Sequence, residues 1–394
     1  MNRVVVTGIG MITAIGNSVE ENHQALIAGR PGIGTIKQFP TRYANMPSGE
    51  VGIDTESLKA KLNIGNPGVT RTSLLALHAA EEAIADAGLT TSQLNQTDTA
   101  LVAATTVGGI CLTDELYNDT HGKSKSPEYL GSYDYASVSL FLQNYYGIKG
   151  IVNTINTACS SSANAIIYAT RLIKNGLAKR AIVGGADSLA KFTINGFNAL
   201  RILSDEVCRP FDEYRKGLNL GEGAAFLVLE REEDVKDKPV YCYISGYGNA
   251  GDAYHPSSLS SDGEGPYKAM QQALAIAGLN PQDIDFINAH GTATENNDEA
   301  ESRAMIRVFS TVPPFASTKS YTGHTLGAAN TVETIYGILS IYHQELYPSL
   351  NFETPITGLG LKPVDSYAKA NIKHVMSNSF GFGGNCATVI VSKI

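Results

Sequence analysis

The sequence predicts an α/β protein built from two similarly organised halves. Apolar and β-branched runs, typical of buried strands, alternate with amphipathic helical segments along the 394 residues. Each half also contains a strand that turns into a helix and, at comparable separation, a glycine-rich turn that leads into a final strand. The charged, proline-containing segment 230–239 is the predicted boundary, so the halves are residues 1–239 and 240–394.

The first half is predicted to begin with a strand and a glycine turn. Val4–Val6 form an apolar run, and Thr7-Gly8-Ile9-Gly10 follow it. This Gly-x-Gly lacks the third glycine and the distant acidic residue of a dinucleotide loop, which favours a tight turn. The segment 113–146, rich in Tyr, Ser and Asp, is predicted to be a helical cap or partner-facing insertion. Helices are predicted over 18–28, 71–88 and 163–174, and buried strands over 100–107, 150–155, 181–186 and 224–229.

The second half repeats this order. A strand over 240–246 precedes a helix over 265–278 and a buried strand over 285–290, and the segment 314–324 leads into a helix over 328–343. The last run, beginning Gly381-Phe382-Gly383-Gly384, is similar to the run that begins Gly221-Glu222-Gly223. The similarity supports an internal duplication.

Composition excludes several classes of protein. The net charge of −8 argues against nucleic-acid binding, and no stretch approaches the roughly 20 apolar residues of a membrane span. The five cysteines are widely spaced and odd in number, which indicates free thiols in a reducing compartment and a cytoplasmic protein. Neither Cys-x-x-Cys nor His-Glu-x-x-His occurs, so no metal site is expected.

Cys159 is the candidate nucleophile. It lies where a predicted strand turns into a helix, and the helix dipole and its unpaired N–H groups stabilise negative charge at such a position. A thiol there is expected to have a lowered pKa and to attack carbonyl groups as a thiolate. The local pattern leaves a second interpretation open, because free cysteines also pack as small apolar residues.

Three residues of the second half support the nucleophile interpretation. His290, Lys319 and His324 each follow a predicted strand, at the edge where open α/β sheets bind ligands. If the halves pack face to face, Cys159 and His324 lie at equivalent positions. The nucleophile and a histidine would then face one cavity.

The motifs around these residues resemble one family over essentially the whole chain. They are Thr-Ala-Cys-Ser-Ser-Ser at Cys159, Asn-Ala-His-Gly-Thr at His290, Lys-Ser-Tyr-Thr-Gly-His from Lys319 to His324, and the terminal Gly-Phe-Gly-Gly. Together they are similar to the elongating (type I/II) β-ketoacyl-[acyl carrier protein] synthases of the thiolase superfamily. The resemblance implies a thiolase-like duplicated αβαβα five-layered fold.

The resemblance also implies an activity. The family catalyses a decarboxylative Claisen condensation of malonyl-acyl carrier protein with an acyl chain held on a cysteine, here Cys159. His290 and His324 would hold the enolate oxygen as neutral N–H donors. Lys319 would supply positive charge with Glu333 as its counter-charge, or the two would form a purely structural pair. The N–H groups of Cys159 and Phe382 would form the oxyanion hole, with the Phe382 ring as a gate.

Further positions match the family's substrate contacts. Val107 corresponds to an acyl-tunnel residue, although a core valine is an equal alternative. Thr292 and Thr294 match positions that bind the pantetheine arm, and Arg201 matches a position that docks the carrier protein. Phe380 precedes the gate, and Asp252 and His255 match a mobile loop beside the gate.

The resemblance implies acyl carrier protein as the partner and no tightly bound cofactor, because phosphopantetheine arrives on the carrier. It implies a homodimer, with a heterodimer containing a chain-length subunit as the alternative. Ser160–Ser162 are more like polyketide-type synthases, so a polyene or polyketide pathway stays open beside fatty acid elongation. Three related classes fit less well. A non-catalytic chain-length subunit would lack Cys159, and a thiolase would use a second active-site cysteine, whereas Cys386 is predicted to pack. An initiating synthase would have asparagine in the place of His324.

Overall fold

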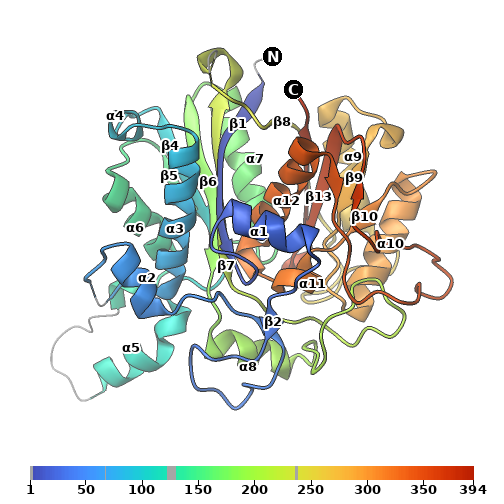
Figure 1. Ribbon diagram of the computed structural model, residues 1–394, viewed down its shortest axis with the longest axis horizontal. Helices are drawn as coiled ribbons and strands as arrows, with labels where there is room; N and C mark the ends of the chain where they lie inside the picture. The colour runs from blue at the N-terminus through green and yellow to red at the C-terminus, as the bar shows by residue number, and fades with distance from the viewer. Residues whose placement is uncertain (1–2, 67, 122–129, 236–237) are drawn as a thin grey trace.

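A computed structural model describes residues 3–66, 68–121, 130–235 and 238–394. Its strands form two arrangements with the same order and the same sense of pairing (Figure 1). In the first half the order is β5 (Val152–Ile155), β4 (Thr99–Ala104), β6 (Arg180–Asp187), β7 (Gly223–Arg231) and β1 (Val4–Thr13). In the second half it is β10 (Phe315–Ala316), β9 (Phe286–Asn288), β13 (His374–Phe380), β14 (Asn385–Ser392) and β8 (Cys242–Gly251).

The pairing directions match strand for strand. β4 runs parallel to β5 and β6, and β7 is antiparallel to β6 and β1. In the same way β9 runs parallel to β10 and β13, and β14 is antiparallel to β13 and β8. The two arrangements meet where Val5 pairs with Tyr243 and Val6 with Cys242, which makes one continuous ten-stranded sheet. The predicted duplication is therefore present in the topology.

Helices form three layers around the strands. The central layer lies between the halves and consists of α7 (Ser161–Lys174) and α12 (Ala329–His343) (Figure 1). The outer side of the first half is covered by α3 (Arg71–Asp86) and α6 (Ala136–Tyr146). The outer side of the second half is covered by α9 (Glu264–Ala277) and α10 (Glu295–Val308). Three large apolar clusters fill the spaces between these layers. The predicted five-layered αβαβα, thiolase-like architecture is confirmed.

The remaining elements lie around this framework. The helices are α1 (Val19–Ile27), α2 (Thr55–Lys61), α4 (Thr91–Leu94), α5 (Thr113–Thr120), α8 (Lys191–Ala199) and α11 (Lys319–Thr322). Two small strand pairs join β2 (Ile33–Gly34) to β3 (Ser48–Gly49) and β11 (Glu345–Leu346) to β12 (Ala368–Lys369). No helix of the described residues is long and apolar enough to span a bilayer.

The predicted glycine turn after Val6 is wrong, because β1 continues to Thr13. Gly8 and Gly10 instead allow α3 to pack directly on the strand. A Cβ on Gly8 would lie 2.2 Å from the Ala83 carbonyl oxygen, and one on Gly10 would lie 2.2 Å from that of Ala79. The glycines are needed for close helix–strand contact and not for a change of chain direction.

Two further expectations change. The run 150–155 was predicted to be a buried strand, but β5 is at the edge of the sheet and its residues are partly or fully exposed. The strand β13 was not predicted at all, although it is central to the second half.

The predicted insertion 113–146 forms α5 and α6, and its residues 122–129 lie outside the described residues. The division at residue 239 stays a prediction, and residues 236 and 237 also lie outside.

We expect Gly10→Ala to lower the free energy of unfolding by about 1–3 kcal/mol, because the added methyl group overpacks the contact with α3. Urea unfolding followed by circular dichroism measures this. Gly34→Ala is the matched control, since a Cβ there meets nothing within 4 Å. A change at Gly10 no larger than that at Gly34 would contradict the packing explanation.

Candidate active site

Cys159 lies between the end of β5 and the start of α7, as predicted. Ala158 before it has a φ of 56°, a left-handed conformation that non-glycine residues rarely adopt. This turn directs the cysteine toward the second half, and only 7% of the residue is exposed. Strain at a turn that presents a reactive side chain is typical of functional sites.

The predicted lowering of the Cys159 pKa is wrong for this arrangement. Burial raises the pKa of the thiol to about 11, because the thiolate would lose its hydration. The charge of Lys319 and the backbone N–H groups of Phe382 and Cys159 act in the opposite direction without overcoming burial. The resting site therefore holds a protonated thiol.

His290 follows β9 and is 1% exposed. Its backbone N–H donates to Glu301 Oε1 at 2.9 Å, which fixes the start of the loop. Lys319 Nζ lies 3.3 Å from His290 Nδ1, and since lysine offers only donors, Nδ1 accepts and Nε2 carries the ring proton. Burial, then the charge of Lys319, holds the pKa of His290 well below its usual value, so the ring is neutral.

His324 precedes α12 and is also 1% exposed. Its backbone N–H donates to the Asn219 carbonyl at 2.8 Å, and its Nδ1 accepts the Leu326 N–H at 3.2 Å. The proton of the neutral ring is therefore on Nε2, which has no partner among the described residues. Burial, then the charge of Lys319, also holds the pKa of His324 well below its usual value.

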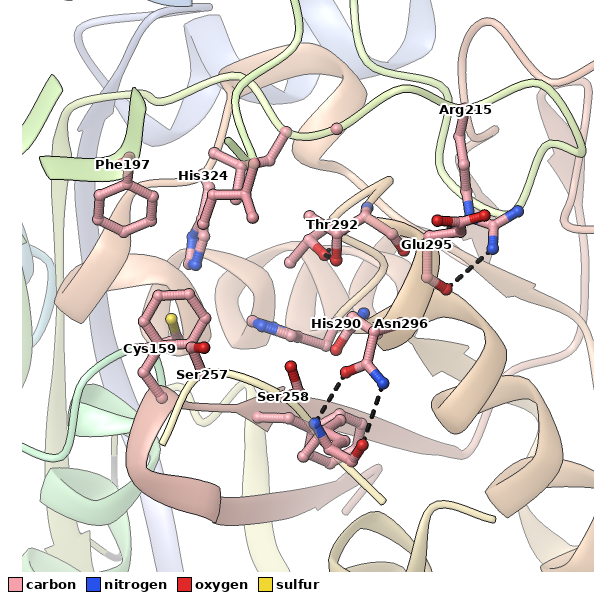
Figure 2. A pocket seen from close by; sticks show the side chains of 18 of the residues that line it. Cys159, Phe197, Arg215, Ser257, Ser258, His290, Thr292, Glu295, Asn296 and His324 are labelled. Atoms are coloured by element: carbon pink, nitrogen blue, oxygen red, sulfur yellow. Dashed lines mark hydrogen bonds between the residues drawn. The ribbon is translucent and has the colours of Figure 1, made fainter. Parts of the chain in front are cut away.

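The structure brings the three residues together. Cys159, His290 and His324 point into one space (Figure 2), with one potential ligand atom of each within 4.8 Å of the others. A metal ion would require lone pairs facing this space. Since Nδ1 accepts a hydrogen bond in both rings, Nε2 presents an N–H, so these residues fit two neutral donors better than two metal ligands.

Lys319 and Glu333 form a buried ion pair behind the histidines. Nζ of Lys319 donates to Glu333 Oε1, and both side chains are 3% exposed. Burial raises the pKa of Glu333 to about 7, and Lys319 opposes that shift. The lysine is thus held beside His290 by a carboxylate on α12.

Two cavities meet at Cys159. One of about 480 Å³ also contacts His290 and His324, and the other, about 430 Å³, contacts Val107. Phe197 and Phe382 line both cavities, and their rings stack with centroids 5.8 Å apart. The aromatic pair stands beside the cysteine between the two spaces.

The other predicted contacts divide between these cavities. Thr292, Thr294 and Arg201 line the cavity of the two histidines, as does Phe380, whose ring is 5.7 Å from that of His290. Val107 lines the more apolar cavity. The structure thus places five of the predicted contact residues around Cys159.

Asp252 and His255 do not line either cavity. The Asp252 carboxylate accepts from the backbone N–H groups of Ser260 and Gly265, each at 2.6 Å, and so holds the loop between them. His255 is exposed and its Nδ1 accepts the Ser257 N–H at 3.2 Å. Their loop lies beside the gate segment, because the Asp252 N–H donates to the Gly384 carbonyl oxygen at 2.8 Å and the Gly383 N–H donates to the Pro256 carbonyl oxygen at 2.7 Å. The mobility of this loop stays a prediction. Cys386 is the second residue of β14 and its side chain is buried, which fits packing.

Sequence reasoning missed several residues that position the site. Glu301 accepts the backbone N–H groups of both His290 and Gly291, and burial raises its pKa to about 7. Asp187, fully buried, accepts from the N–H groups of Val107 at 2.8 Å and Gly327 at 2.7 Å. Asp187 ends an otherwise apolar strand run, a signal that could have identified it. Glu301 lies on a helix whose buried residues also include Asn297 and Asp298, so no sequence signal distinguishes it.

The duplicated fold is that of thiolase-like proteins, and within that class the chain belongs to the β-ketoacyl synthase family. The family model for "Beta-ketoacyl synthase, N-terminal domain" matches residues 1–235, and that for "Beta-ketoacyl synthase, C-terminal domain" matches residues 241–353. The resemblance found in the sequence motifs is confirmed.

Similar proteins include the 3-oxoacyl-[acyl-carrier-protein] synthase 2 of Coxiella burnetii, 34% identical over 100% of this chain and 99% of its own. The putative mitochondrial 3-oxoacyl-[acyl-carrier-protein] synthase of Schizosaccharomyces pombe is also 34% identical, over 100% of this chain and 99% of its own. Both relatives share the full length of the chain.

Solved structures of similar proteins support the same family. The ishigamide ketosynthase/chain length factor superposes with a TM-score of 0.92 at 30% identity, covering 100% of this chain and 99% of that one. A type II polyketide ketosynthase in complex with its acyl-carrier protein, AntDE:AntF, superposes with a TM-score of 0.90 at 28% identity, covering 100% of both chains.

The raised pKa of Cys159 predicts how the thiol reacts with iodoacetamide. Because the thiolate is the reactive form, its alkylation rate should rise about tenfold per pH unit between about pH 7 and pH 9, without a plateau. Mass spectrometry of the peptide containing Cys159 measures the rate, and Cys159→Ala identifies the adduct. A plateau below about pH 8 would instead support stabilisation of the thiolate by the helix start.

The buried ion pair predicts a large loss of stability when one partner is removed. Glu333→Leu leaves Lys319 unpaired in the interior, so we expect the free energy of unfolding to fall by about 3–5 kcal/mol. The double variant Lys319→Met with Glu333→Leu should regain most of it, since no buried charge remains.

Urea unfolding measures both variants, and Glu56→Gln is the control because Glu56 pairs with Lys59 at 81% side-chain exposure. We expect less than about 1 kcal/mol there. Equal losses in the single and double variants would mean that the packing of α12, and not charge, determines the effect.

Proposed function

We propose that the protein is a 3-oxoacyl-[acyl carrier protein] synthase that catalyses a decarboxylative Claisen condensation. It joins an acyl chain, held as a thioester on Cys159, to malonyl-acyl carrier protein and extends the chain by two carbons. The observation that carries the proposal is the meeting of two cavities at a buried cysteine that faces two histidine N–H donors.

The first half-reaction loads the acyl chain. Cys159 Sγ attacks the carbonyl carbon of the acyl thioester, the bond to the pantetheine sulfur breaks, and the departing sulfur takes the proton that the cysteine loses. The raised pKa of Cys159 fits this exchange, because the proton passes from one thiol to another. The N–H groups of Cys159 and Phe382 stabilise the tetrahedral oxyanion, and losing one such donor typically costs about 3–4 kcal/mol.

The second half-reaction uses the histidines. When malonyl-acyl carrier protein loses carbon dioxide, negative charge develops on its thioester oxygen. His290 and His324 donate Nε2–H to that oxygen, and their lowered pKa values keep them neutral donors. The enolate carbon then attacks the carbonyl carbon of the Cys159 thioester, the carbon–sulfur bond breaks, and Cys159 leaves as a thiolate that takes a proton from water.

Lys319 stabilises the negative charge on the enolate oxygen indirectly, through His290. Its ammonium group donates to His290 Nδ1 and so favours the tautomer with its proton on Nε2. Glu333 holds the lysine in place. The rings of Phe382 and Phe197 separate the cavity that receives the pantetheine arm, beside Thr292 and Thr294, from the cavity that receives the acyl chain, beside Val107.

Acyl carrier protein is the proposed partner and brings phosphopantetheine with it, so the enzyme needs no tightly bound cofactor. Arg201 at the cavity mouth offers a positive charge to the acidic carrier. Fatty acid elongation is the function we favour, and the reduced state of all five cysteines fits work in the cytoplasm.

A second candidate is the ketosynthase of a polyene or polyketide pathway. The similarity to the ishigamide ketosynthase/chain length factor and to the AntDE:AntF complex favours it. The chemistry at Cys159 would be the same, with a different acyl chain in the cavity of Val107. A non-catalytic chain-length subunit does not fit, because it would have no use for the buried cysteine facing His290 and His324.

The proposed homodimer rests on the free edge of the sheet. β5 pairs with β4 on one side and has no strand on its other side among the described residues. Nearby α6 presents Leu140, 50% exposed, and Tyr145, 45% exposed. An unpaired edge beside exposed apolar side chains is suited to pairing with a second copy.

The test of the condensing activity is mass spectrometry of the intact protein after incubation with acyl-acyl carrier proteins of increasing chain length. We expect the wild type to gain one acyl group, on the Cys159 peptide, and Cys159→Ala to gain none. Addition of malonyl-acyl carrier protein should then release the acyl group as a product longer by two carbons.

If the wild type never gains an acyl mass, the enzyme proposal fails and the chain-length subunit becomes the better candidate. The longest chain accepted decides between the remaining two. Saturated chains point to fatty acid elongation, and a preference for conjugated unsaturated or poly-β-keto chains points to the specialised pathways.

The edge pairing predicts that Thr154→Pro abolishes a dimer. The Thr154 N–H donates to the side-chain Oδ1 of Asn153 and not to β4, so it lies at the open edge of the sheet, where a partner strand can replace that side chain as the acceptor. Proline removes that donor from the edge. Light scattering after size exclusion should show a dimer for wild type and Thr154→Ala, and a monomer for Thr154→Pro. A dimer in all three would place the interface elsewhere.

A further inference from the structure

The loop that carries Phe382 is attached to the nucleophile turn at both of its ends. Before the loop, Ser379 Oγ donates to the Cys159 carbonyl oxygen at 2.8 Å. After the loop, Ser160 Oγ donates to Asn385 Oδ1 at 2.7 Å. The short segment 381–384 is therefore flanked by two side-chain hydrogen bonds, one to the nucleophile itself and one to the residue that follows it. Backbone bonds also hold it, because the Gly383 N–H donates to the Pro256 carbonyl oxygen at 2.7 Å and the Gly384 carbonyl oxygen accepts the Asp252 N–H at 2.8 Å.

The second attachment is the more elaborate one. Asn385 Oδ1 also accepts from Asn164 Nδ2 at 2.8 Å and from Asn249 Nδ2 at 3.1 Å. Ser160 and Asn164 belong to the first half of the chain, and Asn249 lies on β8 of the second. One amide oxygen thus gathers three donors and ties the start of α7 to the strand that follows the loop.

Between the attachments two glycines adopt a conformation that other residues rarely take. Gly383 and Gly384 have φ values of 81° and 77°, in the left-handed region that glycine tolerates. The Phe382 N–H nevertheless faces the Cys159 sulfur, where it opposes the rise in the thiol pKa. As a gate, the Phe382 ring would swing away from Phe197, with which it stacks at 5.8 Å between ring centroids, whereas the N–H must keep its place to serve as an oxyanion donor.

We propose that Asn385 is a positioning residue that keeps the Phe382 N–H aligned with Cys159 while the Phe382 ring moves. The hydrogen bond to Asn385 also assigns a role to Ser160, the first residue of the run Ser160–Ser162. Ser160 connects the nucleophile turn to the gate loop and does not contact the reacting atoms. This inference rests on the proposed condensation, because only that function requires both a donor and a moving ring at one residue.

The inference predicts a different effect on each half-reaction. In Asn385→Ala the three donors lose their common acceptor, so the side-chain link between the end of the loop and the nucleophile turn is lost. A donor displaced by about 1 Å costs on the order of 100-fold, so acyl transfer to Cys159 should slow by about 10- to 100-fold. Decarboxylation of malonyl-acyl carrier protein without an acyl donor should change less than about threefold, because Glu301 and Lys319 hold His290 independently of the loop.

The experiment measures both rates in the full-length protein. Single-turnover mass spectrometry follows acylation of Cys159, and release of carbon dioxide from malonyl-acyl carrier protein follows the other step. Asn385→Asp keeps an oxygen for the three donors and should restore most of the acylation rate. Asn175→Ala is the control, since Asn175 caps the far end of α7 and its side chain donates to the Arg171 carbonyl oxygen.

Slower acylation in Asn385→Ala, with decarboxylation retained and rescue by Asn385→Asp, supports the inference. Equal loss of both rates, or no loss of either, overturns it. If Asn385→Ala does not fold, Ser160→Ala removes one donor and should slow acylation alone by about 2- to 10-fold. Failure of the wild type to acylate would overturn the proposed function instead, so the two failures are distinguishable.

Discussion

The close packing of the two central helices is the constraint on which the rest of the structure depends. α7 begins beside Cys159 and α12 begins beside His324, and both lie between the two halves of the sheet (Figure 1). Ser162 Oγ accepts the Thr331 N–H at 3.1 Å, so the two helix starts are joined directly. A Cβ on Gly185 would lie 2.9 Å from the Gly327 carbonyl oxygen, which shows how little space separates the halves. This contact brings a cysteine and a histidine from equivalent positions of a duplicated fold to one point.

Desolvation then determines the chemistry of the site. Burial favours the neutral forms of Cys159, His290 and His324, and it raises the pKa of Glu333 as well. Lys319, held by Glu333, is the cation beside them. A site of neutral donors beside one fixed cation is suited to charge that appears only during a reaction, because no counter-ion must be displaced when the charge forms.

Backbone attachment provides the precision that these buried groups need. Glu301 holds the loop of His290, Asp187 holds the turns of Val107 and Gly327, and Asn385 holds the end of the Phe382 loop. In each case a side-chain oxygen accepts donors from segments far apart in the sequence. These attachments fix the segments around the site, including the end of the loop that carries Phe382.

The sequence by itself determined most of the duplicated order of strands and helices, the cysteine that is the candidate nucleophile, and the family to which the chain belongs. It did so because apolar periodicity and short motifs are local properties that do not depend on distant contacts. Only the tertiary structure decided the use of Gly8 and Gly10, the edge position of β5, and the raised pKa of Cys159. It also revealed Ser160 and Asn385 as partners. Each of these features depends on atoms from distant segments that pack against the residue. The free energy of burying a group is determined by those surrounding atoms, and the neighbouring residues in the sequence do not reveal them.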